Sequence, residues 1–238
     1  MPVDPAERMP ADVRRMFDGI ADRYDLANRI LSLGRHRAWR RAAASMLAPR
    51  EGSRLLDLCA GTGDLALAFA RFRPGRIVCA DFSGPMLLRG RAKIERARLG
   101  CPVSWVRADA LSLPFRDASF DGAGVAFGVR NFADRANGLS ELARVLKPGA
   151  SLVVLEFARP PDTLLGRLAG WFASRVVPGV GQAVSRSPDR AYHYLARTIE
   201  DFPDPAGFAV LLESAGFADV RRKTRAFGVV AMYAARRR

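Results

Sequence analysis

The stretch LLDLCAGTGD at residues 55–64 decides the fold. A short apolar run that ends in a glycine turn is typical of a buried strand feeding a tight turn. Because glycine has no Cβ, the backbone at Gly61 and Gly63 can approach a ligand closely. A helix is predicted next, over residues 64–73. The stretch therefore predicts a strand, a ligand-binding turn and a helix in succession.

The same alternation continues along the chain. Further strands are predicted at residues 77–80, 103–106, 120–127, 151–157, 217–223 and 227–233. Helices are predicted at residues 85–98, 134–146 and 208–214, with the triplet KPG at 147–149 closing the second of these. Strands that alternate with helices indicate βαβ units and a mostly parallel sheet, so the fold class is α/β.

Two segments lie outside this alternation, and we expect a single domain over residues 1–238 that includes both. Residues 12–48 show apolar side chains at helical spacing and predict a helical N-terminal cap, broken at Gly34. Residues 159–197 contain four prolines and an apolar helical piece at 164–177. We expect this second segment to be an insertion over the ligand-binding edge of the sheet, on the substrate side.

Composition excludes several classes of protein. Apolar residues make up 49% of the 238 residues, which excludes a disordered chain. The three cysteines are scattered, so neither a disulfide scaffold nor a zinc site is expected, and we expect no metal. No apolar run is long enough to span a membrane, and the N-terminus lacks an apolar signal core, so we expect a cytoplasmic protein. The net charge of +14 fits an arginine-biased surface or attraction to an anionic membrane better than nucleic-acid binding, which we do not expect.

Three acids, Asp57, Asp81 and Asp109, mark the ends of the first three predicted strands, where open parallel sheets bind ligands. Two classes of cofactor fit this pattern. The letters GTGDLA at 61–66 match the dinucleotide pattern G-x-G-x-x-[GA], with Asp81 near the spacing of its ribose-binding acid. However, Asp57 and Asp64 place negative charge where a pyrophosphate would lie. The acids suit the cationic S-adenosylmethionine better, although the dinucleotide stays a remote alternative.

For that methyl donor, each acid has an expected role. Asp57 would face the amino-acid end, Asp81 would accept from the ribose diol, and Asp109 with the backbone of Ala110 would lie beside the adenine. Asp64 has a second interpretation as the N-cap of its helix. Cys59, beside the turn, is expected to be a small buried apolar residue.

Several stretches resemble the quinone-biosynthesis C-methyltransferases, which methylate demethylmenaquinol and 2-polyprenyl-6-methoxy-benzoquinol. The resemblance runs from about residue 16 to 232 and is carried by FDGIADRYD at 17–25, LSLG at 31–34, LCAGTGD at 58–64, FGVRN at 127–131, RVLKPG at 144–149, LEF at 155–157, YHYL at 192–195 and IEDFP at 199–203. Glycine turns of this kind occur in many methyltransferases. The FGVRN stretch and the block at 192–203 are more specific, and they narrow the resemblance from methyltransferases in general to this family.

The resemblance implies a class I S-adenosylmethionine-dependent methyltransferase fold. This fold is Rossmann-like, with a mostly parallel seven-stranded sheet and an antiparallel last strand. The family's donor-binding positions correspond to Thr62, Asp81 and the pair Asp109 and Ala110, beside the turn glycines Gly61 and Gly63 and the acid Asp57. Bacterial members often carry serine at the position of Ala126, so that one hydroxyl contact is absent here.

The implied reaction is methylation of a ring carbon of a prenylated quinol. A quinone ring is electron-poor, so the acceptor must be the reduced quinol, ideally as a phenolate. We expect Arg130 to stabilise the developing oxyanion and Asn131 to orient the hydroxyl or a bridging water. The alternative for Arg130 is a structural ion pair with an acid. His193 is a second candidate base, although a packing role fits it better.

The implied acceptor carries a long prenyl tail, and the apolar helical piece at 164–177 offers a place for it. The same piece, with Arg167, Arg175 and Arg186 nearby, would allow peripheral contact with an anionic membrane at the inner face. Ordinary packing is the alternative. Phe17 and Tyr24 either close over the donor or belong to a helix core.

Other functions stay open at this point. The chain could methylate another small aromatic or lipid acceptor, or serve as a non-catalytic scaffold in a quinone-synthesis assembly. Intact Asp57, Gly61, Gly63 and Asp81 argue against the scaffold. The sequence does not distinguish a benzoquinol from a naphthoquinol acceptor, and it leaves the oligomeric state open, with a homodimer as one expectation.

Overall fold

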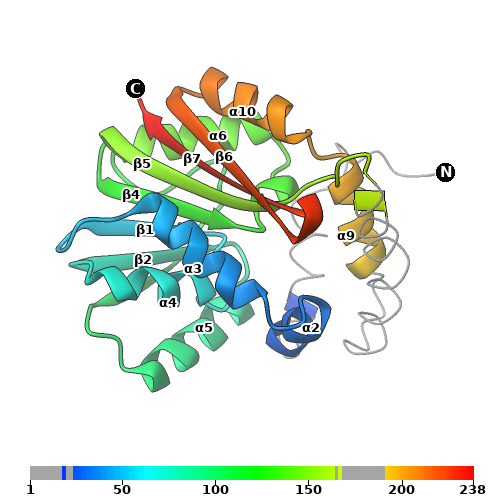
Figure 1. Ribbon diagram of the computed structural model, residues 1–238. Coiled ribbons are helices and arrows are strands. Elements are labelled where there is room, and N and C mark those ends of the chain that lie inside the picture. Colours follow the sequence, from blue (N-terminus) through cyan, green and yellow to red (C-terminus); the bar gives the residue numbers. More distant parts are fainter. Residues whose placement is uncertain (1–17, 20–23, 164–165, 168–190) are drawn as a thin grey trace.

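A seven-stranded sheet forms the centre of the molecule in the computed structural model, which describes residues 18–19, 24–163, 166–167 and 191–238 (Figure 1). The strand order is β3-β2-β1-β4-β5-β7-β6. β7 runs antiparallel to both of its neighbours, and the other pairs are parallel, which confirms the expected sheet. The strands are β1 Arg54–Leu58, β2 Arg76–Asp81, β3 Val103–Arg107, β4 Phe120–Ala126, β5 Leu146–Phe157, β6 Phe217–Arg225 and β7 Val230–Arg237.

Helices cover both faces of the sheet because the strands are apolar on both sides. Leu55 belongs to an apolar cluster with α3 and α4, while its neighbour Leu56 belongs to a second cluster with α6 and α10. Figure 1 shows α3, α4 and α5 on one face and α6 and α10 on the other. The helices are α2 Tyr24–Leu31, α3 His36–Leu47, α4 Asp64–Phe69, α5 Gly84–Ala97, α6 Arg135–Val145, α9 Ala191–Glu200 and α10 Pro205–Ser214.

The carboxyl ends of the central strands meet at one edge of the sheet. Leu58 at the end of β1 is in register with Ala80 on β2 and with Val125 on β4. Figure 1 places α2 and α9 beyond this edge, although the two helices are far apart in the sequence. Residues from the strand ends and from both helices therefore converge there.

Several expected element boundaries are wrong, including the start of α10, which lies at Pro205 and not at residue 208. The triplet KPG at 147–149 does not close a helix but lies within β5, because Leu146 pairs with Phe120 and the register then shifts before Ser151. The helix after the glycine turn ends at Phe69, followed by a 3-10 turn at Ala70–Phe72. The last strand begins at Val230 rather than at 227, since the preceding segment forms a turn with positive φ.

The expected break in the N-terminal helical region is confirmed. Gly34 has φ of +74° and separates α2 from α3. Residues 12–17 and 20–23 of the expected cap lie outside the described residues. So does most of the apolar piece at 164–177, of which only 166–167 are described, as helix.

Candidate active site

The glycine turn after β1 takes a left-handed backbone path. Cys59, Gly61 and Gly63 have φ of +56°, +52° and +79°. Two features favour glycine at Gly63. Its φ is positive, and an added Cβ would lie only 3.0 Å from the Trp105 ring. Cys59 is half-buried and faces the pocket, and the positive φ explains why its position suits glycine.

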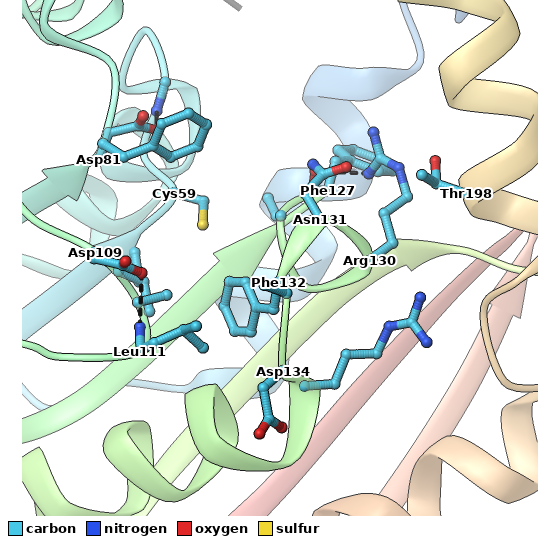
Figure 2. Close-up of a pocket in the computed structure, with 18 of the residues that line it drawn as sticks. Cys59, Asp81, Asp109, Leu111, Phe127, Arg130, Asn131, Phe132, Asp134 and Thr198 are labelled. Carbon is cyan, nitrogen blue, oxygen red and sulfur yellow. Dashed lines mark hydrogen bonds between the residues drawn. The ribbon is translucent and has the colours of Figure 1, made fainter. Parts of the chain in front are cut away.

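Asp81 ends β2 and fixes the turn. Its Oδ2 accepts from the backbone N–H of Gly61 at 2.8 Å, and its Oδ1 accepts from that of Ser83 at 2.9 Å. Burial raises the pKa of Asp81 to about 6, although these backbone hydrogen bonds oppose the shift. The carboxylate lines the pocket, with lone pairs left for a ligand hydroxyl (Figure 2).

Asp57 lies behind the turn rather than in the pocket. The side chain is 1% exposed, and its Oδ2 accepts from the backbone N–H of Ala66 at 2.9 Å. Burial raises the pKa of Asp57 to about 8, so the carboxyl is mostly protonated at neutral pH. Asp57 is absent from the pocket lining, and its visible contact supports the start of α4.

Thr62 and Gly63 also lie outside the pocket lining. The Thr62 hydroxyl donates to Asp25 Oδ1 at 2.6 Å and accepts from Lys93 Nζ at 2.8 Å. The interpretation of Asp64 as an N-cap is wrong, because Gly63 occupies the N-cap position and Asp64 instead bonds Lys93 Nζ at 2.7 Å. Although burial raises the pKa of Asp64, nearby Arg40 and Lys93 bring the net pKa below its ordinary value.

The Asp109 and Ala110 pair lines the pocket after β3. Asp109 is exposed, and its Oδ1 accepts from the backbone N–H of Leu111 at 2.9 Å, which shapes a short turn. Ala110 is buried, as is Ala126 across the pocket. Ala126 presents only a methyl group where a serine would offer a hydroxyl.

The pocket at this edge has a volume of about 670 Å³, within the ~300–1,000 Å³ range of small-molecule sites. It has two chemically different ends. Figure 2 shows Asp81, Asp109 and Cys59 on one side and Arg130, Asn131 and Thr198 on the other. The sequence-predicted residues that line it are Gly61, Asp81, Asp109, Ala110, Arg130 and Asn131.

Arg130 forms a buried ion pair. The side chain is 7% exposed, and its Nη1 donates to Glu156 Oε1 at 2.7 Å. The same Nη1 donates to the carbonyl of Phe127 at 2.6 Å (Figure 2). Glu156 is fully buried on β5 and also accepts from the backbone N–H of Phe157 at 2.8 Å. Arg130 therefore forms the structural ion pair that was the alternative to a catalytic role. It also lines the pocket.

Two polar atoms beside each other in the chain have no hydrogen-bond partner among the described residues. They are Arg130 Nε, a donor, and Asn131 Oδ1, an acceptor, and both are buried. Buried polar atoms are nearly always hydrogen-bonded, so such atoms in a pocket wall require a ligand or water. A hydroxyl group both donates and accepts, so it can pair with either atom.

Sequence analysis missed several residues of the site. Glu156 lies in the buried, apolar part of β5. An acid in such a strand indicates that a basic side chain pairs with it, and this could have been inferred from the sequence. Arg135 follows the FGVRN stretch and also lines the pocket, with an unpartnered Nε among the described residues. α9 contributes Tyr194, Arg197 and Thr198 to the pocket, and no local pattern predicts that.

Other predicted site residues have different outcomes. Tyr24 lines the pocket, and a Cβ added at Gly61 would lie 3.9 Å from its ring. Phe17, Arg175, Arg186 and the side chain of His193 lie outside the described part of the chain.

Two kinds of feature are absent within the described ranges. They contain no group of three or more His, Cys, Asp or Glu side chains that could hold a metal ion. No helix within them has both the length and the apolar character needed to cross a membrane.

Comparison with known proteins points to one family. The family model described as the ubiE/COQ5 methyltransferase family matches residues 6–237. A demethylmenaquinone methyltransferase from Thermus thermophilus is 46% identical over 219 residues, covering 92% of this chain and 98% of the relative. A ubiquinone/menaquinone biosynthesis C-methyltransferase from Paracoccus denitrificans is 39% identical, covering 93% of this chain and 88% of the relative.

Solved structures agree on the fold. A SAM-dependent methyltransferase from Aquifex aeolicus gives a TM-score of 0.61 at 18% identity, covering 84% of this chain and 89% of its own. A second one, from Thermotoga maritima, gives 0.64 at 18% identity, covering 94% and 99%. At these identities the likeness concerns the fold alone.

Proposed function

Since the chain belongs to the ubiE/COQ5 methyltransferase family, we propose that it transfers a methyl group from S-adenosylmethionine to a ring carbon of a prenylated quinol. The relatives carry this chemistry in their names, with demethylmenaquinone in one group and ubiquinone or menaquinone biosynthesis in the other. The acceptor is accordingly a benzoquinol or a naphthoquinol.

One observation in the pocket carries the proposal. Arg130 Nε and Asn131 Oδ1 are a buried donor and a buried acceptor without partners in the described chain, as a phenolic hydroxyl requires. The carboxylates of Asp81 and Asp109 stand at the other end of the same pocket. The pocket thus offers an acidic end for a cationic donor and a hydroxyl-binding end for the acceptor.

The acidic end suits S-adenosylmethionine. Gly61 lets the backbone approach the ligand, and Asp81, mostly ionised at neutral pH, accepts from the ribose diol. Asp109 and Ala110 border the adenine. Asp57, Thr62 and Gly63 serve the donor indirectly, because their contacts hold the glycine turn in shape.

The hydroxyl-binding end prepares the acceptor. Bound S-adenosylmethionine would supply an electrophilic methyl group, whose bond to sulfur breaks with the electron pair remaining on sulfur as the ring carbon forms the new bond. That ring carbon then loses its proton to water, which restores the aromatic ring. Asn131 accepts from the phenolic hydroxyl or from a bridging water that carries its proton to solvent. Arg130 donates to the oxygen as negative charge develops there. Glu156 keeps the guanidinium in place and balances its charge.

The prenyl tail calls for contact with a membrane, and one exposed face supplies apolar and basic groups. Leu26 and Ile30 on α2 are 52% and 38% exposed, and Leu33 in the turn after this helix is 79% exposed. Exposed arginines stand beside them at Arg29 and Arg35. We expect co-sedimentation with anionic vesicles that weakens as salt is raised, and salt-independent absence of binding would contradict this part of the proposal.

The direct test is an assay with S-adenosylmethionine and chemically reduced acceptors, followed by product mass. Demethylmenaquinol and a prenylated methoxy-benzoquinol are offered separately. Gain of one methyl group on either acceptor supports the proposal and shows which ring is preferred. Donor binding without transfer to either would contradict the acceptor, and absence of donor binding would contradict the enzyme activity altogether.

A further inference from the structure

Lys93 on α5 bonds three separate parts of the chain. Its ammonium group donates to Asp25 Oδ2 at 2.8 Å, to Thr62 Oγ1 at 2.8 Å and to Asp64 Oδ1 at 2.7 Å. An ammonium group has three N–H donors, so these contacts use all of them. Lys93 thereby joins α2, the glycine turn and the start of α4, and it is one of only three lysines among 38 basic residues.

Thr62 closes the same network. Its hydroxyl accepts from Lys93 and donates to the other oxygen of Asp25 at 2.6 Å. Asp25, Thr62 and Lys93 therefore form a closed ring of hydrogen bonds, which we call the α2 clasp. The Thr62 side chain is 3% exposed, and its hydroxyl is committed to the clasp rather than turned to the pocket.

Two large apolar side chains of α2 remain partly exposed. Leu26 is 52% exposed and Ile30 is 38% exposed, so neither gains the full benefit of burial. The polar contacts of Asp25 add an attachment of α2 to the glycine turn and to α5. A second polar contact joins the N-terminal region to the loop after β2, where Ser83 donates to Asp18.

The position of α2 matters to the pocket because Tyr24 is the neighbour of Asp25. Tyr24 lines the pocket beside Gly61, on the acidic side assigned to the donor. When the clasp fixes Asp25, it also fixes the backbone that carries Tyr24. If the clasp opens, α2 loses these polar contacts and this wall of the donor site loosens.

We propose that Lys93 is a positioning residue for the methyl donor. Through the clasp it holds α2 on the glycine turn so that Tyr24 covers the bound donor, and Thr62 acts through this network rather than by touching the donor. The inference rests on the proposed function, since it needs S-adenosylmethionine in the pocket. Donor binding and the docking of α2 are then coupled, and each strengthens the other.

The test is a double-mutant cycle on donor affinity, with wild-type binding of S-adenosylmethionine measured first by calorimetry. Lys93→Met and Asp25→Asn should each weaken binding about tenfold, and the double variant should bind about as weakly as either single variant. The KM for the donor should rise while kcat at saturating donor changes little. Thr62→Val should behave like Lys93→Met, whereas Thr62→Ser keeps the hydroxyl and should bind nearly as tightly as wild type.

A matched control and a second readout keep a folding defect apart from loss of the clasp. Arg91 lies on the same helix, is exposed, and pairs with Glu95, so Arg91→Met should leave donor affinity unchanged. Arg29 on α2 is a trypsin site, and the donor should slow cleavage there in wild type but not in Lys93→Met.

The outcomes separate this inference from the proposed function. If wild type does not bind the donor, the proposed function fails. If wild type binds and Lys93→Met binds equally well, or if the losses in the double variant multiply, the clasp is contradicted while the proposed function stands. Equal donor protection at Arg29 in both proteins would contradict it too.

Discussion

Arg130 and Glu156 form an ion pair at the wall of the pocket, with the two side chains 7% and 0% exposed. A buried pair of this kind costs solvation energy and gives little net stability, but removing one partner leaves a costly buried charge. The pair therefore makes Arg130 important for folding whether or not it acts on the acceptor. A single substitution cannot separate the two roles.

A paired substitution can separate them. Arg130→Met should lower the free energy of unfolding by about 3–5 kcal/mol, because Glu156 is left buried and unpaired. Arg130→Met combined with Glu156→Gln leaves no buried charge, so most of that stability should return. Turnover should stay about 100-fold or more below wild type, since the donor to the oxyanion is missing. Urea unfolding and methyl transfer at saturating donor measure the two effects.

The exposed pair of Arg91 and Glu95 provides the control. Arg91→Met should change stability by less than about 1 kcal/mol, as is usual for surface ion pairs. Recovery of turnover together with stability in the double variant would show that Arg130 is only structural.

Asp81 predicts a pH dependence of donor binding. Burial raises its pKa from 3.8 to about 6, so the folded protein takes up a proton between these values and its stability falls as pH rises through that window. The ribose diol donates to the ionised carboxylate, so donor binding favours loss of that proton. Affinity should therefore be constant above about pH 7 and fall as pH drops below about 6.

Calorimetry of S-adenosylmethionine across this range checks the prediction. Asp81→Asn cannot titrate, so it should bind more weakly at neutral pH and show a flatter profile. A wild-type affinity that does not change between about pH 5 and 7.5 would contradict the role of Asp81.

The positions of single site residues could be predicted from the sequence where the strand order alone determines them. Asp81 and Asp109 follow strands, and strand ends of a parallel sheet meet at one edge, so their convergence was predictable. Asp57 is the second-last residue of β1, yet its side chain points behind the turn toward Ala66. Which side a carboxylate takes at a strand end depends on the path of the turn, and no spacing in the sequence reveals that.

Among the elements, α5 packs tightly against the glycine turn of the site. A Cβ at Gly90 would lie 2.6 Å from the Trp105 ring and 3.1 Å from the backbone of Thr62. The backbone of α5 thus approaches the glycine turn as closely as a glycine allows. Lys93 extends from this helix to the α2 clasp. The close approach of α5 therefore supports both the glycine turn and the clasp.

Gly90→Ala tests this packing. Alanine favours a helix over glycine by up to about 1 kcal/mol, so a loose site would gain stability. Here overpacking should dominate and cost about 1–3 kcal/mol, and the displaced helix should weaken donor binding. Gly84→Ala on the same helix is the control, because a Cβ there would meet nothing within 4 Å and should not destabilise the protein. Equal stability of the two variants would contradict the account of α5.

Element existence was predicted better than element boundaries. The central strands β1, β2 and β4 were visible as short apolar runs between turns, because both of their faces are buried. The start of β5 was not, since Gly149 at φ +75° and Pro148 resemble a helix end while the chain continues into the sheet. That outcome depends on pairing of Leu146 with Phe120, a contact between distant segments.

At the scale of the whole molecule, the pocket depends on segments that lie far apart in the sequence. The turn after β1, the loop after β4, α2 and α9 all contribute to one cavity. The contributions of α9 could not be derived from local patterns, because only the folded sheet brings residues 194–201 to the same edge. The resemblance in the block at 192–203 indicated that this segment matters, but not where it lies.

The cavity as a whole joins an acidic end to an end with a buried hydrogen-bond donor and acceptor. This arrangement predicts the redox state of the acceptor, because a hydroxyl can pair with either Arg130 Nε or Asn131 Oδ1, whereas a quinone carbonyl can pair only with the donor. An electron-rich reduced ring is also what carbon methylation requires. The reduced acceptor should therefore be the substrate, and the oxidised form should not.

The most direct test offers S-adenosylmethionine with a deuterium-labelled methyl group to the reduced and the oxidised form of the same prenylated acceptor, and locates the label by mass spectrometry and NMR. We expect the label on a ring carbon of the reduced acceptor and no transfer to the oxidised one. Label on a hydroxyl oxygen, or equal transfer to both forms, would contradict the account.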